Sequence, residues 1–226
     1  MKNDNSLYKS FDEICLDEIE TDYTNFSGKV SSNGNGTSIN EDEKIKVIAN
    51  HFKGIMQTLG LDLNDDSLKG TPQRVAKMYV KEIFSGLNRD NEPVATLFEN
   101  KYQYNKMLVE KDITLYSYCE HHFVPIIGKV HVAYISKGKV IGLSKINRLV
   151  QYYAKRPQVQ ERLTNQIAEA LKKAIGTEDV AVVIDAVHLC VASRGIKDTG
   201  SSTITAHYSG KFINEGTKNE FLTFIK

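Results

Sequence analysis

The chain has 226 residues, 41% of them hydrophobic and 25% charged, which is ordinary usage for a globular protein rather than a fibre or a disordered polymer. Lysine and arginine total 29 against 28 acidic residues, so no global basic field indicates a nucleic acid or an anionic lipid as partner. No apolar run is long enough for a membrane span, and acidic residues stand where a signal peptide would be apolar, so we expect a cytoplasmic protein without a membrane partner. Three cysteines, odd in number and far apart, predict reduced thiols rather than a disulfide framework.

The N-terminal part of the chain divides into a tail and a helical region. Residues 1–40 are polar and end in a Ser-, Asn- and Gly-rich stretch, which predicts a flexible tail. Apolar residues then recur at steps of three and four up to Leu59, which predicts an amphipathic helix that Gly60 ends. A second helix is predicted from Thr71, as its cap, to Gly86, and we expect residues 41–110 to form one N-terminal helical region.

Residues 111–226 alternate between strand and helix patterns and form the predicted catalytic domain. Alternating or β-branched apolar stretches predict strands at 113–118, 128–135, 138–143, 180–190 and 202–208. Helical periodicity marks residues 144–153 and 158–175, and a short C-terminal helix follows the last strand. Helices placed between strand pairs favour the α+β class over a doubly wound parallel sheet.

A cluster of metal-ligating residue types follows the first of these strands. Cys119 and His122 stand three residues apart, a spacing that lets one tight turn aim a thiolate and an imidazole at one zinc ion. Cys190 offers a third ligand, because strand alternation would put it on the same face as His188. Three protein ligands leave a position for water, as in catalytic zinc sites, and bound zinc lowers the pKa of such water to about 7.

Two histidines of the same segments remain for proton transfer. His121 and His188 are not needed as ligands of a three-ligand site, and imidazole is the side chain best suited to carry protons near neutral pH. The spacing also leaves open that they are structural, or that one of them is a fourth ligand in a zinc site that serves only folding.

A second constellation could bind an anion. Ser144 is expected to cap the helix that starts there, and Lys145 and Arg148 lie one turn apart behind the positive end of that helix. An ordinary solvated basic face is the alternative interpretation. Further along, the carboxylate of Glu161 could accept two hydrogen bonds from a guanine edge, although exposed helix ion pairs would use the same residue types.

Taken together, these segments resemble GTP cyclohydrolase I from about residue 45 to the end of the chain. The resemblance rests on CEHHFVP at 119–125, GLSKINRLV at 142–150, RPQVQERLT at 156–164 and HLC at 188–190 followed by Arg194. TPQRVAKMYV at 71–80 also resembles the N-terminal helical segment of that family.

The resemblance implies a fold, a reaction and a role for each residue. The fold is the tunnelling fold, an antiparallel sheet with two helices packed on one face, preceded by an N-terminal helical region. The reaction is the zinc-dependent opening of the imidazole ring of GTP at C8, with release of formate and rearrangement to 7,8-dihydroneopterin triphosphate, the first step of pterin and tetrahydrofolate synthesis. Implied ligands of Zn2+ are Cys119, His122 and Cys190, and the implied catalytic residues are His121 and His188.

The resemblance also implies how GTP is held. Gln160 and Glu161 would meet the purine, and the ribose and triphosphate would contact Ser144, Lys145, Arg148 and Arg194. Arg74 and Lys77 match basic residues that reach the triphosphate from a neighbouring subunit. Members of the family form homodecamers whose active sites lie at subunit contacts. Residues 1–40, including Cys15, fall outside the resemblance.

Two rival interpretations remain. A nitrile reductase of the same fold works through a nucleophilic cysteine and a nicotinamide cofactor, and the Cys119, His122 and Cys190 set favours a metal instead. A zinc-stabilised oligomer or pterin-binding module without catalysis would need a fourth protein ligand, for which His121 or His188 is available.

Overall fold

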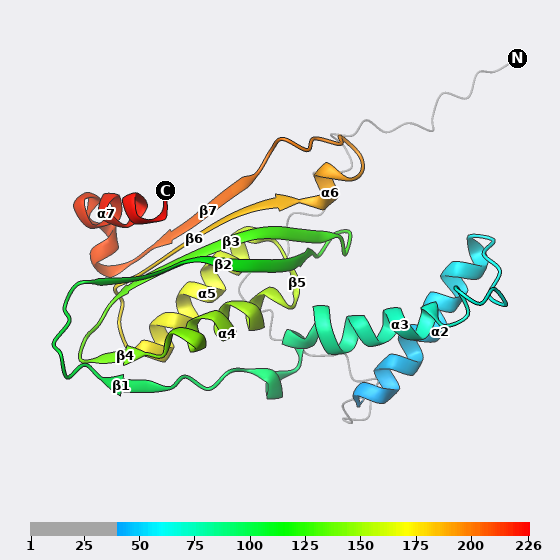
Figure 1. The fold of residues 1–226 in the computed structure, drawn as a ribbon, viewed down its shortest axis with the longest axis horizontal. Helices are drawn as coiled ribbons and strands as arrows, with labels where there is room; N and C mark the ends of the chain where they lie inside the picture. Colours follow the sequence, from blue (N-terminus) through cyan, green and yellow to red (C-terminus); the bar gives the residue numbers. More distant parts are fainter. Residues whose placement is uncertain (1–39) are drawn as a thin grey trace, which may run out of the picture. The chain divides into compact units, whose positions relative to one another are not determined.

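The computed structural model describes residues 40–226 (Figure 1). The predicted flexible tail, apart from its last residue, and Cys15 lie outside the described residues. Among the residues described, no helix has the length and apolar character needed to cross a membrane.

Helix α2, Glu41–Thr58, begins and ends where local chemistry favours it. The Asn40 side chain accepts a hydrogen bond from the Glu43 amide at 2.9 Å, and acidic residues fill the first turn, where the helix dipole favours negative charge. Gly60 has a φ of 79°, a left-handed conformation that suits glycine just after a helix. The predicted end of this helix is therefore confirmed.

Helix α3, Thr71–Met78, is shorter than the sequence predicts. Gly70 precedes it and makes no side-chain cap, so the prediction of Thr71 as cap is wrong, and Pro72 takes the second helical position. At Tyr79 the helix widens into the π-helix η1, Tyr79–Ile83. An i→i+5 turn brings side chains five apart to one side, and Tyr79 and Phe84 both contact Phe123, with ring centroids 6.3 and 4.9 Å away.

Two 3-10 turns then lead into the sheet domain. They are η2, Ser85–Leu87, and η3, Arg89–Asn91. The Gly86 amide donates to the Lys155 carbonyl at 2.9 Å, and the Arg156 Nε atom donates to the Gly86 carbonyl at the same distance. These two bonds join the helical region to the end of the first sheet-covering helix.

The main sheet has five strands in the order β5-β2-β3-β6-β7. Its strands are β2 (Met107–Cys119), β3 (Pro125–Ile135), β5 (Pro157–Gln158), β6 (Val180–His188) and β7 (Thr203–Tyr208). All pairs are antiparallel except the short β2–β5 pair. A separate antiparallel pair joins β1, Leu97–Glu99, to β4, Lys139–Ile141.

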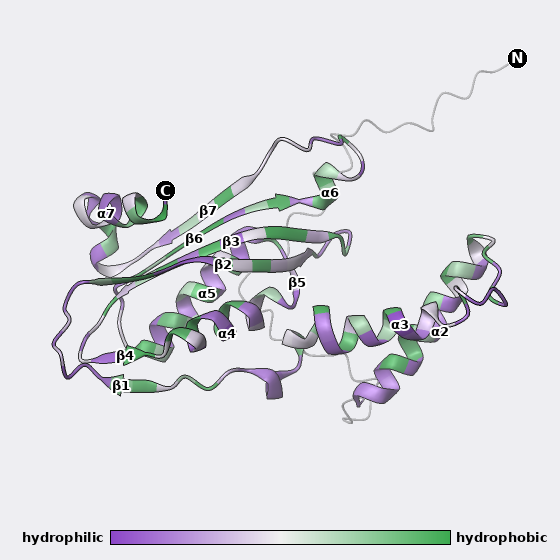
Figure 2. Ribbon diagram, viewed as in Figure 1, coloured by the Kyte–Doolittle hydropathy of each residue, from purple (hydrophilic) through white to green (hydrophobic). Residues whose placement is uncertain are grey.

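Helices cover both faces of this sheet, because the side chains along each strand point alternately to one face and to the other. Val130, Val132 and Tyr134 of β3 pack with helices α4 (Leu143–Ala154) and α5 (Gln160–Ile175). On the opposite face, Ala133 and Ile135 pack with Phe212 of η4 (Gly210–Ile213) and Phe221 of α7 (Glu215–Ile225). Figure 2 shows hydrophobic stretches along the central strands and on α4 and α5. The predicted α+β class, with two helices on one face of the sheet, is confirmed.

A matched pair of glycine substitutions tests this arrangement. A Cβ atom at Gly128 in β3 would lie 2.1 Å from the Asp185 carbonyl oxygen and 2.6 Å from the Ala186 Cβ atom of β6. We expect Gly128→Ala to lower the free energy of unfolding by about 1–3 kcal/mol, because the backbone of two central strands must move apart.

The control is Gly54→Ala in α2, where the added Cβ atom meets no described atom within 4 Å. Alanine in a helix interior should raise the free energy of unfolding by up to about 1 kcal/mol. Chemical denaturation of both variants measures the two effects, and equal stability of the two variants would contradict the close strand contact at Gly128.

Candidate functional site

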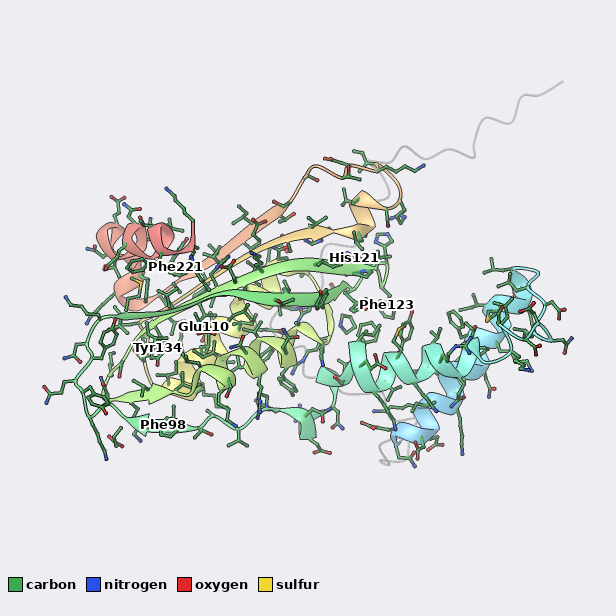
Figure 3. All side chains as sticks on the ribbon, viewed as in Figure 1. Phe98, Glu110, His121, Phe123, Tyr134 and Phe221 are labelled. Atoms are coloured by element: carbon green, nitrogen blue, oxygen red, sulfur yellow. The ribbon has the colours of Figure 1, made fainter. Side chains whose placement is uncertain are left out.

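The pairing of β3 with β6 places two distant segments side by side. The turn between β2 and β3 is closed by the Phe123 amide, which donates to the Cys119 carbonyl at 2.8 Å. Ile126, next to this turn, pairs with His188 at the end of β6. Residues 119–122 therefore lie beside the segment that carries Cys190. Figure 3 shows His121 at this end of the sheet.

Cys119, His122 and Cys190 form the metal-binding cluster, and the predicted grouping is confirmed. Their ligand atoms all lie within 4.8 Å of one another. Burial raises the pKa of the Cys190 thiol, and the neighbouring Cys119 raises it further. The Cys190 thiol thus needs a nearby positive charge to become a thiolate, and two sulfur atoms with one imidazole are a donor set that zinc prefers. The residues present fit a zinc ion.

The strand argument for Cys190 is wrong, although the residue is correct. Strand β6 ends at His188, and Cys190 lies in the short helix α6, Leu189–Ala192. Alternation along a strand therefore does not place His188 and Cys190 on one face. The helical turn directs Cys190 towards the β2–β3 turn instead.

The two histidines of the β2–β3 turn contact the same sulfur atom. The Nδ1 atoms of His121 and His122 lie 3.7 and 3.9 Å from Cys119 Sγ. The other ring nitrogen of His122 lies 3.1 Å from an Arg194 guanidinium nitrogen, whereas that of His121 is 4.0 Å from a Glu120 carboxylate oxygen. His121 is thus next to the metal cluster but faces a carboxylate with its far nitrogen.

An ion pair that the sequence did not suggest holds this turn. Arg162, in the first turns of α5, donates to the Glu120 carboxylate and also to the Gln158 side chain at 3.1 Å. The Glu120 amide donates to the Gln158 carbonyl at 3.0 Å. Both charged side chains are partly buried, so the pair fixes the metal-binding turn to α5. A single sequence does not indicate that two opposite charges 42 positions apart form an ion pair.

His188, at the end of β6, is held by Gln160. Its Nε2 atom lies 2.7 Å from the Gln160 Oε1 atom. Burial lowers the pKa of His188, and the nearby Glu161 opposes this shift. Gln160 itself is 1% exposed, whereas Glu161, the next residue of α5, is exposed.

The residues that the sequence predicts to bind an anion lie at the start of α4. Gly142 is the N-cap residue, and the Lys145 amide donates to its carbonyl at 2.8 Å, so the helix starts before Ser144. The prediction that Ser144 caps the helix is therefore wrong. Ser144 and Arg148 are exposed, and Arg148 lines a hollow of about 530 Å3 together with Lys81 and Lys155.

Arg74 and Lys77 lie on α3 and both are exposed. Arg74 donates to the Ser67 carbonyl at 2.7 Å and to the Thr71 hydroxyl at 2.8 Å. These bonds hold its guanidinium against the segment that precedes α3.

Comparison with known proteins gives a consistent result. A model of the family described as GTP cyclohydrolase I matches residues 48–226. "GTP cyclohydrolase 1" of Flavobacterium johnsoniae is 60% identical over 214 residues, which cover 95% of this chain and 96% of the relative. The proteins of the same name from Aeromonas salmonicida and Erwinia tasmaniensis are 54% and 55% identical, over 84% and 83% of this chain and 87% and 86% of their own lengths.

The matched region contains the whole sheet domain and all three residues of the metal cluster. The identity is high along nearly the full length of both chains, far above the level at which a shared fold alone would be the conclusion. This chain therefore belongs to the GTP cyclohydrolase I family.

Proposed function

We propose that this protein opens the imidazole ring of GTP at C8, releases formate and forms 7,8-dihydroneopterin triphosphate. The observation that carries the proposal is the cluster of Cys119, His122 and Cys190 in a member of this family, with His121 directly before His122 and His188 two residues before Cys190. Zinc bound there would supply a Lewis acid that makes water reactive at neutral pH.

The protein's own residues would then move protons and hold the purine. His121 and His188 are the proposed proton carriers, because His121 contacts the sulfur atom of Cys119 and His188, two residues before Cys190, has its Nε2 atom held by Gln160. Glu161 is the proposed partner of the guanine edge, because its carboxylate is exposed in the first turn of α5 and can accept two parallel N–H bonds.

We propose that the triphosphate is held by basic residues from more than one copy of the chain. Arg194 lies at the metal cluster, whereas the hollow next to Arg148 is lined by none of the three cluster residues. Ser144, Lys145 and Arg148 on α4 would hold the ribose and triphosphate together with Arg194, and Arg74 and Lys77 on α3 would reach the triphosphate from a neighbouring subunit in a homodecamer. Residues 41–110 would thus act as a helical region that supplies a neighbour's site, and residues 111–226 as the catalytic domain.

Incubation of the purified protein with GTP tests the proposed reaction. We expect equimolar formate and a pterin product that becomes fluorescent after oxidation. Binding of GTP without formate release would instead favour a non-catalytic zinc-containing module.

Removal of the metal should abolish formate release and leave most secondary structure in place. The described domain has a continuous apolar core between the sheet and helices α4 and α5, so it does not depend on an ion to fold as zinc fingers do. Far-ultraviolet circular dichroism and formate release should be measured before chelation, after it, and after zinc is restored. Loss of helices and strands with the metal would make the ion structural.

Replacement of His121 by alanine should lower kcat by about 10²–10⁴-fold, the usual contribution of a general acid or base. The zinc content should not change, because Cys119, His122 and Cys190 already form the cluster. The control is His51→Ala on the exposed side of α2, which should change neither quantity. Loss of zinc from His121→Ala would identify His121 as a ligand.

Replacement of Arg148 by alanine should raise KM for GTP by about 10- to 100-fold with little change in kcat. A hydrogen bond to a charged group contributes about 1.5–3 kcal/mol, and a contact to the triphosphate serves substrate and transition state alike. Arg89→Ala, which removes an exposed arginine of η3, is the matched control. Unchanged steady-state kinetics of Arg148→Ala would exclude the proposed phosphate contact.

A further inference from the structure

The side chain of Gln160 is buried at the start of α5, and each of its polar atoms has a partner inside the protein. It is 1% exposed. Its amide nitrogen has two N–H groups and three acceptors within hydrogen-bond distance, which are the Thr203 carbonyl at 2.8 Å, the Thr205 hydroxyl at 3.1 Å and the Ile184 carbonyl at 3.2 Å. Its Oε1 atom lies 2.7 Å from His188 Nε2. The amide thus connects β6, β7 and a proposed catalytic histidine.

Chemistry settles which end of the amide faces His188. Two of the three groups around the nitrogen are backbone carbonyls, which accept and cannot donate. The reversed amide would place its oxygen against both carbonyl oxygens. The Gln160 oxygen therefore faces His188.

A ring of hydrogen bonds through Thr164, Thr205 and Gln160 independently supports the same amide orientation. The Thr164 hydroxyl donates its proton to the Gln160 main-chain carbonyl at 2.8 Å. In the 2.7 Å contact between Thr164 and Thr205, the proton must then come from Thr205, because each hydroxyl has one. The Thr205 oxygen is left to accept, and its partner Gln160 must donate through its amide nitrogen.

We propose that Gln160 is a positioning residue that selects the tautomer of His188, an inference that rests on the proposed function. Because the Gln160 oxygen can accept and not donate, His188 must carry a proton on Nε2. In the neutral ring Nδ1 then bears the lone pair, so Nδ1 is the nitrogen that exchanges a proton with the substrate. Thr205 supports this arrangement through the orientation of the Gln160 amide.

This role differs from direct recognition of the purine by the Gln160 side chain. A purine contact would require the amide to leave three acceptors and the His188 ring, each of which would then lose a buried partner. The neighbouring Glu161 is exposed and its carboxylate can serve the purine without such a loss. The two roles predict different kinetic defects.

Replacement of Gln160 by methionine, which is similar in size and lacks both amide groups, tests the proposal in the zinc-loaded full-length protein. We expect kcat for formate release to fall about 10- to 100-fold, because a mispositioned proton carrier loses most of its contribution. KM for GTP should change less than about twofold, and zinc content should be that of the wild type. A raised KM with unchanged kcat would assign Gln160 to the purine and overturn the inference.

A matched pair at Thr205 covers the case in which the methionine variant does not fold. Thr205→Val keeps the size of the side chain and removes the hydroxyl, so kcat should fall about 2- to 10-fold, the effect of one hydrogen bond. Thr205→Ser keeps the hydroxyl and should restore most of the lost turnover. Equal kcat values for the two variants would contradict the directed ring.

Nitrogen-15 NMR of histidine-labelled, zinc-loaded protein gives a readout that a merely structural role would not change. The His188 signals are identified by their loss in His188→Ala. We expect Nε2 to be the protonated nitrogen in the wild type and a mixture of tautomers in Gln160→Met. Protonation of the wild-type ring on Nδ1 alone would refute the inference. If the wild type releases no formate from GTP, the proposed function fails, whereas the tautomer measurement still decides the role of Gln160.

Discussion

The antiparallel register between β3 and β6 is the constraint on which the site depends. It pairs Ile126 with His188, and so brings the end of β2 and the end of β6 together although they are far apart in sequence. Because side chains alternate along a strand, a shift of one residue would exchange the face of β6 that packs on α4 and α5 with the face that packs on Phe212 and Phe221, so these two buried faces enforce the register that the metal cluster needs. The packing that stabilises the sheet thus also positions Cys119, His122 and Cys190 before any ion binds.

The first turn of α5 is the second organising element. Successive residues there have separate tasks: Gln160 holds His188, Glu161 is exposed, and Arg162 holds Glu120 of the metal-binding turn. A helix that packs on the sheet through Leu163, Ile167 and Leu171 gives these side chains a rigid base. The same helix therefore contacts His188 through the Gln160 amide and, through Arg162, holds the turn that carries His121.

Much of the fold and of the metal cluster could be predicted from the sequence, because both depend on local patterns. Apolar periodicity located the helices over α4 and α5, and ligand type with spacing identified Cys119 and His122. The failures have separate physical reasons, some in contacts between distant residues and some in the local backbone. Aromatic packing against Phe123 widens the helix after Met78, α6 replaces the predicted end of β6, and the first turn of α4 closes on Gly142 rather than on Ser144. Neither the Glu120–Arg162 pair nor the Gln160–His188 contact has a signal in one sequence.

The central claim is that three protein ligands, two of them cysteines, hold a zinc ion with a position left for water. X-ray absorption at the zinc edge of the purified protein tests it most directly, because sulfur and lighter donors scatter differently. The account predicts two sulfur donors at about 2.3 Å and two lighter donors at about 2.0–2.1 Å, with one sulfur lost in Cys190→Ser. The same two lighter donors should remain, one of them an imidazole and the other a water. A site with two imidazole donors and no water, or one without sulfur, would contradict the account.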